Sequence, residues 1–101
     1  MDVEDVLAEL NLDETDENKK TIKSILEQAE QIIANSVDQN VKLTDLEKNK
    51  IFQRAVITLT TDLYYNRTLP DGLSLGVQMM INTLKGVDFN AKQETATKTK
   101  N

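Results

Sequence analysis

The sequence predicts an all-α protein: a small bundle of about four helices with a flexible C-terminal tail. The main observation is that apolar residues recur at the three- and four-residue spacings of amphipathic helices along most of the chain. The second is that residues 90–101 contain almost no apolar side chain, which is typical of a segment that stays disordered until it is bound. A chain of 101 residues suits one domain, which we place at residues 1–86, followed by a polar tail at 87–101.

The first two predicted helices are separated by a polar turn at residues 13–18, which offers several helix caps. The first is short, and its apolar side consists of Val3, Val6, Leu7 and Leu10. The second has the clearest pattern, one stripe made of Ile22, Ile25, Leu26, Ala29, Ile32 and Ile33.

Thr44 and Glu47 have the spacing of a capping box, which predicts that a third helix opens there. The apolar stripe of this helix is wide and predicts a central position; it consists of Phe52, Ala55, Val56, Leu59 and Leu63, with Ile51 and Ile57 beside them. Pro70 cannot continue the helix, and the segment PDG predicts a type I turn. A fourth helix follows and stops near Gly86, with an apolar side of Leu73, Val77, Met80, Ile81 and Leu84.

The composition excludes several kinds of chemistry. Without Cys or His, the chain has no disulfide, no thiolate metal site and no Ser–His or Cys–His relay. The acidic segment from residue 13 fails as a calcium loop, because Asn18 and Ser24 stand where Gly and Glu are required. We therefore expect no enzyme, no cofactor and no metal. No apolar run approaches the roughly 20 residues of a membrane span, and the first residues are acidic where a secretory signal is basic, so we expect a soluble protein made in a cytoplasm.

Acidic residues are concentrated near the N-terminus. The net charge of the chain is −5, and residues 2–17 contain eight acids without a Lys or Arg. Binding to a phosphate backbone normally needs a cationic patch, so a direct grip on nucleic acid is disfavoured.

Residues 62–72, DLYYNRTLPDG, contain both tyrosines and the only proline. Tyr64 and Arg67 are expected to fix the corner between the third and fourth helices. Adjacent tyrosines point about 100° apart on a helix, so one of the two is expected to meet a second surface. Tyr and Arg are also enriched at binding hot spots. On the fourth helix, spacing predicts that Met80 is core and that Met79 faces a partner or solvent.

The order of segments resembles the phage head–tail connector family, the adaptors that dock as a ring beneath the portal of tailed phages and prophages. The resemblance covers residues 1–86 in layout and is most specific at the motifs Tyr-x-Asn-Arg and Leu-Pro-x-Gly, that is, at Tyr64, Asn66, Arg67, Leu69, Pro70 and Gly72. The polar stretch DQNVKLTDLEKNK departs from the family pattern.

The resemblance implies a virion structural protein without enzymatic activity. It would self-associate into a ring of twelve copies at the head–tail junction, after assembly in the host cytoplasm. Its partners would be the portal protein and a further connector or tail protein, with no membrane. DNA would pass through without specific binding, since carboxylates repel its backbone. The tail, which begins with Val87 and Phe89, would become ordered on the portal.

Two other functions fit the same residues. One is a small helical regulatory protein that binds a single protein partner through the Tyr64–Gly72 corner. The other is a DNA mimic whose acidic first segment occupies a basic groove. Whichever applies, the interface candidates are Tyr64, Tyr65, Asn66, Arg67, Leu69, Pro70, Gly72, Met79 and Phe89.

Overall fold

The computed structural model describes residues 2–38, 40–66, 68–69 and 71–87. Within these ranges the chain forms five α-helices and no strand, which confirms the all-α prediction. The helices are α1 (Val3–Glu9), α2 (Asp16–Val37), α3 (Leu43–Leu46), α4 (Lys50–Tyr65) and α5 (Leu75–Lys85). Four of them correspond to the four predicted helices, and α3 is an additional single turn.

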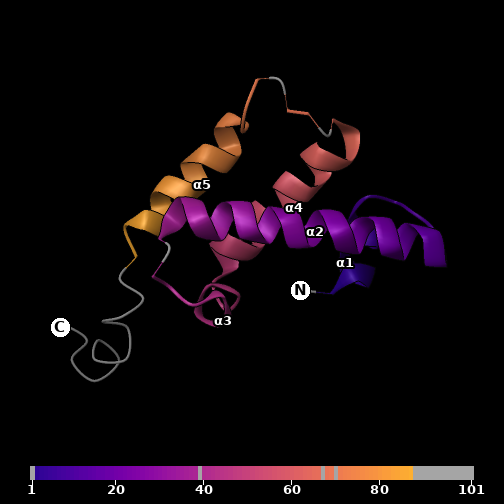
Figure 1. Cartoon of the computed structure of the whole chain (residues 1–101), viewed down its shortest axis with the longest axis horizontal. Helices are drawn as coiled ribbons and strands as arrows, with labels where there is room; N and C mark the ends of the chain where they lie inside the picture. Colours follow the sequence, from indigo (N-terminus) through magenta and orange to yellow (C-terminus); the bar gives the residue numbers. More distant parts are fainter. Residues whose placement is uncertain (1, 39, 67, 70, 88–101) are drawn as a thin grey trace.

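Helix α2 is the element on which the others assemble (Figure 1). Helix α4 crosses it and makes the largest contact, while α1 lies along the side nearer the start of α2. Helices α4 and α5 form an antiparallel hairpin that is closed by the turn between them, and α5 lies over the C-terminal half of α2. None of the described helices is both long and apolar enough to cross a membrane.

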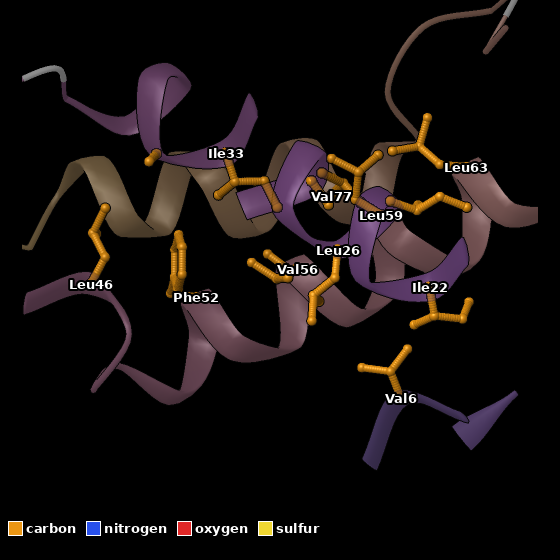
Figure 2. Packing of buried hydrophobic residues seen from close by; sticks show 14 of the residues in the cluster. Val6, Ile22, Leu26, Ile33, Leu46, Phe52, Val56, Leu59, Leu63 and Val77 are labelled. Carbon is orange, nitrogen blue, oxygen red and sulfur yellow. The ribbon is translucent and has the colours of Figure 1, made fainter. Parts of the chain in front are cut away.

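The buried core is one aliphatic cluster with a single aromatic side chain, Phe52, which lies in the first turn of α4 near Leu46 (Figure 2). The predicted stripe of α2 is buried as expected, except that Ile32 is only partly buried. The predicted stripe of α4 is buried throughout, which agrees with its central position. The fully buried large side chains are Val6, Leu7, Ile22, Ile33, Leu46, Phe52, Val56, Leu59, Thr60, Val77 and Leu84.

Side-chain hydrogen bonds cap the first turns of α2 and α5. Thr15 accepts a hydrogen bond from the Asn18 amide at 3.0 Å at the start of α2, within the polar turn that was expected to supply a cap. Ser74 accepts one from the Val77 amide at 3.3 Å at the start of α5. Each bond satisfies an amide that the first turn of a helix leaves without a partner.

The predicted capping box is wrong. Helix α3 follows Lys42 without a side-chain cap, and it ends before Glu47. Helix α4 begins later, at Lys50. Its N-cap is Asn49, whose Oδ1 accepts hydrogen bonds from the Ile51 and Phe52 amides at 2.8 and 3.1 Å. Asn49 caps α4 effectively because its side chain satisfies two amides of the first turn at once.

The turn between α4 and α5 places two residues in left-handed backbone geometry. Leu69 has φ 45° and Gly72 has φ 78°, and the Gly72 amide donates to the Leu69 carbonyl at 2.8 Å. A side chain at position 72 would be strained by this φ, which explains the glycine. The predicted type I geometry depends on Pro70, which lies outside the described residues.

The last described residues connect the bundle to the tail. Helix α5 begins after Leu73, which packs against the core from the preceding turn. Gly86 caps the end of α5, as predicted. Val87, which we placed in the tail, is partly buried against the core, and its amide donates to the Leu84 carbonyl at 3.0 Å. The predicted mobile segment after it lies outside the described residues.

Candidate interaction surface

The two adjacent tyrosines at the end of α4 have different environments. Tyr64 is partly buried and packs against the core, whereas the Tyr65 side chain is 70% exposed. Their ring centroids are 5.1 Å apart with an interplanar angle of 86°, the edge-to-face arrangement that aromatic pairs favour. Tyr64 therefore supports the corner from inside and holds the ring of Tyr65 toward solvent, as their angular separation predicts.

A shallow hollow of about 530 Å³ lies at this corner. Tyr65 and Leu75, which is 71% exposed, both line it. The other lining residues come from the end of α4 and the turn: Asp62, Asn66, Leu69, Asp71, Gly72, Leu73 and Ser74. Two of these lining residues, Asp62 and Asp71, are acidic and stand beside the two exposed apolar side chains, and Oδ2 of Asp62 is buried without a hydrogen-bond partner among the described residues.

A second hollow lies between α4 and α5 at the other end of the hairpin. This groove has a volume of about 390 Å³ and is lined by Lys50, Ile51, Arg54, Met79, Met80 and Thr83. Met79 is 60% exposed, as its helical position predicts. Met80, which was predicted to be a core residue, packs against the core but is only partly buried, and it also lines the groove.

One face of α5 connects the two hollows. Leu75, Met79 and Thr83 are four residues apart, so they lie along the same side of the helix. Leu75 lines the corner hollow, and Met79 and Thr83 line the groove. We call this continuous strip, together with Tyr65, the outer face of the hairpin. It contains the three large hydrophobic side chains that are exposed in the described part of the chain.

A third hollow, of about 290 Å³, is acidic. Carboxylates of Asp2, Asp5, Glu30 and Glu47 surround it, although they come from separate elements of the chain. Burial raises the pKa of Glu30; the positive charge of the N-terminal amine lowers it in part, and the carboxylates of Glu47 and Glu27 raise it by smaller amounts. Because the folded state then holds this proton more tightly, the contribution of Glu30 to stability is lost as pH rises through its folded pKa. No group of acidic side chains in the described ranges has the arrangement of a metal site.

The remaining interface candidates lie at or beyond the corner. Asn66 is exposed at the end of α4, and its Oδ1 accepts a hydrogen bond from the Thr68 hydroxyl at 3.0 Å. Leu69 packs against the core, and Gly72 is exposed in the turn. The other three, Arg67, Pro70 and Phe89, lie outside the described residues.

Replacing Tyr64 with alanine is expected to lower the free energy of unfolding by about 1–2 kcal/mol. The ring is only partly buried, so the loss falls below the roughly 3–5 kcal/mol of a fully buried aromatic side chain. Urea denaturation of the wild type and the variant measures this difference, with the exposed Tyr65→Ala variant as the matched control. Equal stability of the Tyr64 variant and the wild type would show that Tyr64 does not support the corner.

Comparison of the chain with known protein families, with curated proteins and with solved structures finds no match. The interaction surface therefore rests on geometry alone. The sequence pattern predicted Tyr65 and Met79 as interface residues but did not predict Leu75, which lines the corner hollow. The four-residue spacing from Leu75 through Met79 to Thr83 was the signal that could have found this strip.

Proposed function

We propose that this protein is a non-enzymatic virion structural protein, an adaptor that forms a ring between the portal and the tail of a phage or prophage. In this role it extends the DNA channel during head completion. The sequence motifs at Tyr64–Gly72 support the proposal, and so does the all-α fold in which these motifs form the corner between two helices. The function is mechanical, and it requires surfaces for protein partners.

The observation that carries the proposal is the outer face of the hairpin. Tyr65, Leu75 and Met79 expose most of their surface to water, and all three lie on or beside α5. Exposed apolar side chains that lie together commonly mark protein–protein interfaces, because their removal from water drives association. A Met in the groove adds an adaptable contact, and a Tyr at the corner adds a rigid one.

The charge of the chain suits a protein that surrounds DNA without binding it. The eight acids in residues 2–17 give this segment a strongly negative field. In this proposal the acids of residues 2–9 face the channel and repel phosphates, so DNA slides past them. The same charge disfavours a cationic grip on nucleic acid.

A second function is favoured by the corner hollow. In this hollow Tyr65 and Leu75 lie beside two acidic residues, Asp62 and Asp71. That arrangement would also suit a regulatory protein that binds one partner through an apolar side chain with a basic neighbour. This alternative predicts a complex of fixed small stoichiometry in place of a ring.

Native mass spectrometry of the full-length chain, alone and mixed with the portal protein encoded by the same genome, tests the proposal. The expected result is a ring of copies on the portal, with twelve as the copy number that the family resemblance implies. A chain with Tyr65→Ser and Leu75→Ser is expected to lose this assembly while keeping its helical circular dichroism spectrum. A complex of one copy with one other protein would favour the regulatory function, and failure to bind the portal would contradict the connector proposal.

A further inference from the structure

The groove between α4 and α5 differs from the rest of the molecule in charge. Helix α4 has two cations, Lys50 and Arg54, against one acid, and α5 has one cation and no acid. Both cations of α4 line the groove, beside the apolar side chains of Ile51 and Met79. In a chain with a net charge of −5, this is an apolar surface with a cationic rim.

The cations of the groove are accessible to a partner. Arg54 is paired with Glu9 of α1 at 3.6 Å, but its side chain is 63% exposed and a guanidinium has further donors. Lys50 is exposed and has no ion pair among the described residues. Met79, whose side chain is also exposed, lines the same groove from α5.

A surface of complementary charge lies at the start of α2. Asp13 and Glu14 precede α2, and Asp16 and Glu17 form its first turn, where they suit the positive end of the helix. All four are exposed, and none has an ion pair within the described part of the chain. We call residues 13–17 the acidic end.

The α5 side of the groove lies far from the acidic end of the same copy. Residues 13–17 lie at the start of α2, whereas α5 lies over its C-terminal half (Figure 1). Helix α2 has 22 residues, which corresponds to a length of roughly 33 Å. Contacts between two different surfaces of the same protein are head-to-tail, and such contacts build a ring when the rotation between copies closes.

We propose that the groove of one copy binds the acidic end of the next copy, so that the protein self-associates head to tail. Lys50 and Arg54 pair with the carboxylates of residues 13–17, beside the side chains of Met79 and Ile51 that line the same groove. This inference rests on the proposed ring, and it specifies which two surfaces form that ring. Because the charges lie at an exposed rim, added salt weakens the contact.

Two variants with separate defects test this contact. Met79→Glu places a negative charge in the groove, and Asp13→Lys/Glu14→Lys reverses the charge of the acidic end. All three positions are exposed, so both variants are expected to keep the thermal stability and helicity of the wild type. Gln28→Glu and Glu27→Lys, on the exposed side of α2, are the matched controls for added negative and reversed charge.

Analytical ultracentrifugation of the full chain, free and bound to portal, gives the readout. Wild-type protein and both controls are expected to self-associate, and each variant alone is expected to stay monomeric or nearly so. An equal mixture of the two variants is expected to form a heterodimer that does not grow, because only one intact groove meets one intact acidic end. This capped dimer is specific to a head-to-tail contact.

Two other results would overturn the inference in distinguishable ways. Self-association of both variants at wild-type strength would show that the ring uses other surfaces, and it would leave the connector proposal standing. Absence of any self-association by the wild type, both free and on the portal, would contradict the inference and the connector proposal together.

Discussion

Replacing Phe52 with alanine is expected to lower the free energy of unfolding by about 3–5 kcal/mol. Phe52 is fully buried and is the one aromatic side chain within the described core, where Leu46 and Ile33 belong to the same cluster (Figure 2). Its removal leaves a cavity at the start of α4, where three elements meet. In a domain of this size the loss corresponds to a fall in Tm of roughly 15–30 °C.

Thermal and urea denaturation, followed by circular dichroism, measure the effect of this substitution. Phe52→Leu keeps most of the buried volume and is the matched control, with an expected loss of less than about 1.5 kcal/mol. The Asn49 cap is unchanged in both variants, since its bond is to the backbone amide of residue 52. A loss below about 1 kcal/mol for Phe52→Ala would contradict the central position of this side chain.

Replacing Leu7 with alanine is expected to release α1 from the bundle. Helix α1 has seven residues, too few to be stable alone in water, so its folding depends on contact with its neighbours. That contact is made by Val6 and Leu7, which are fully buried, and by Leu10. Truncating Leu7 is expected to cost about 2–5 kcal/mol of this docking energy.

Hydrogen exchange distinguishes local release of α1 from destabilisation of the whole bundle. In the Leu7→Ala variant the α1 amides are expected to lose protection, while amides in the middle of α2 and α4 keep most of theirs. Ala8→Ser, at an exposed position of the same helix, is the control and is expected to leave α1 protected. Unchanged protection of α1 in the Leu7 variant would show that the helix is held by other contacts.

The amphipathic helices could be predicted from the sequence, because an apolar stripe on a helix requires a buried face. The stripes of α2 and α4 are long enough for their periodicity to decide both helix type and burial. The start of α4 was predicted wrongly. Thr44 and Glu47 have the spacing of a capping box, but the side chain that caps α4 is Asn49. The spacing of residues alone does not show that Leu46 is buried, nor that Asn49 accepts hydrogen bonds from two backbone amides.

The interaction surface could be predicted only in part. Helical angles were sufficient to turn Tyr65 and Met79 outward, because those angles depend on local geometry alone. The groove could not be predicted, because it needs Lys50 and Arg54 of α4 to lie opposite residues of α5 nearly 30 positions away. Nor could the acidic hollow, whose carboxylates come from elements that only tertiary packing brings together.

The central claim is that the outer face of the hairpin is buried when the protein assembles. Because the chain contains no cysteine, Met79→Cys places a single thiol on this face, and Gln31→Cys places one on the exposed side of α2 as a control. The measurement is the rate of modification by a water-soluble maleimide, on free protein and on portal-bound assemblies. We expect the thiol of the Met79→Cys variant to react much more slowly in the assembly, and that of the control to react at an unchanged rate. Equal rates for Met79→Cys in the free and assembled protein would contradict the claim.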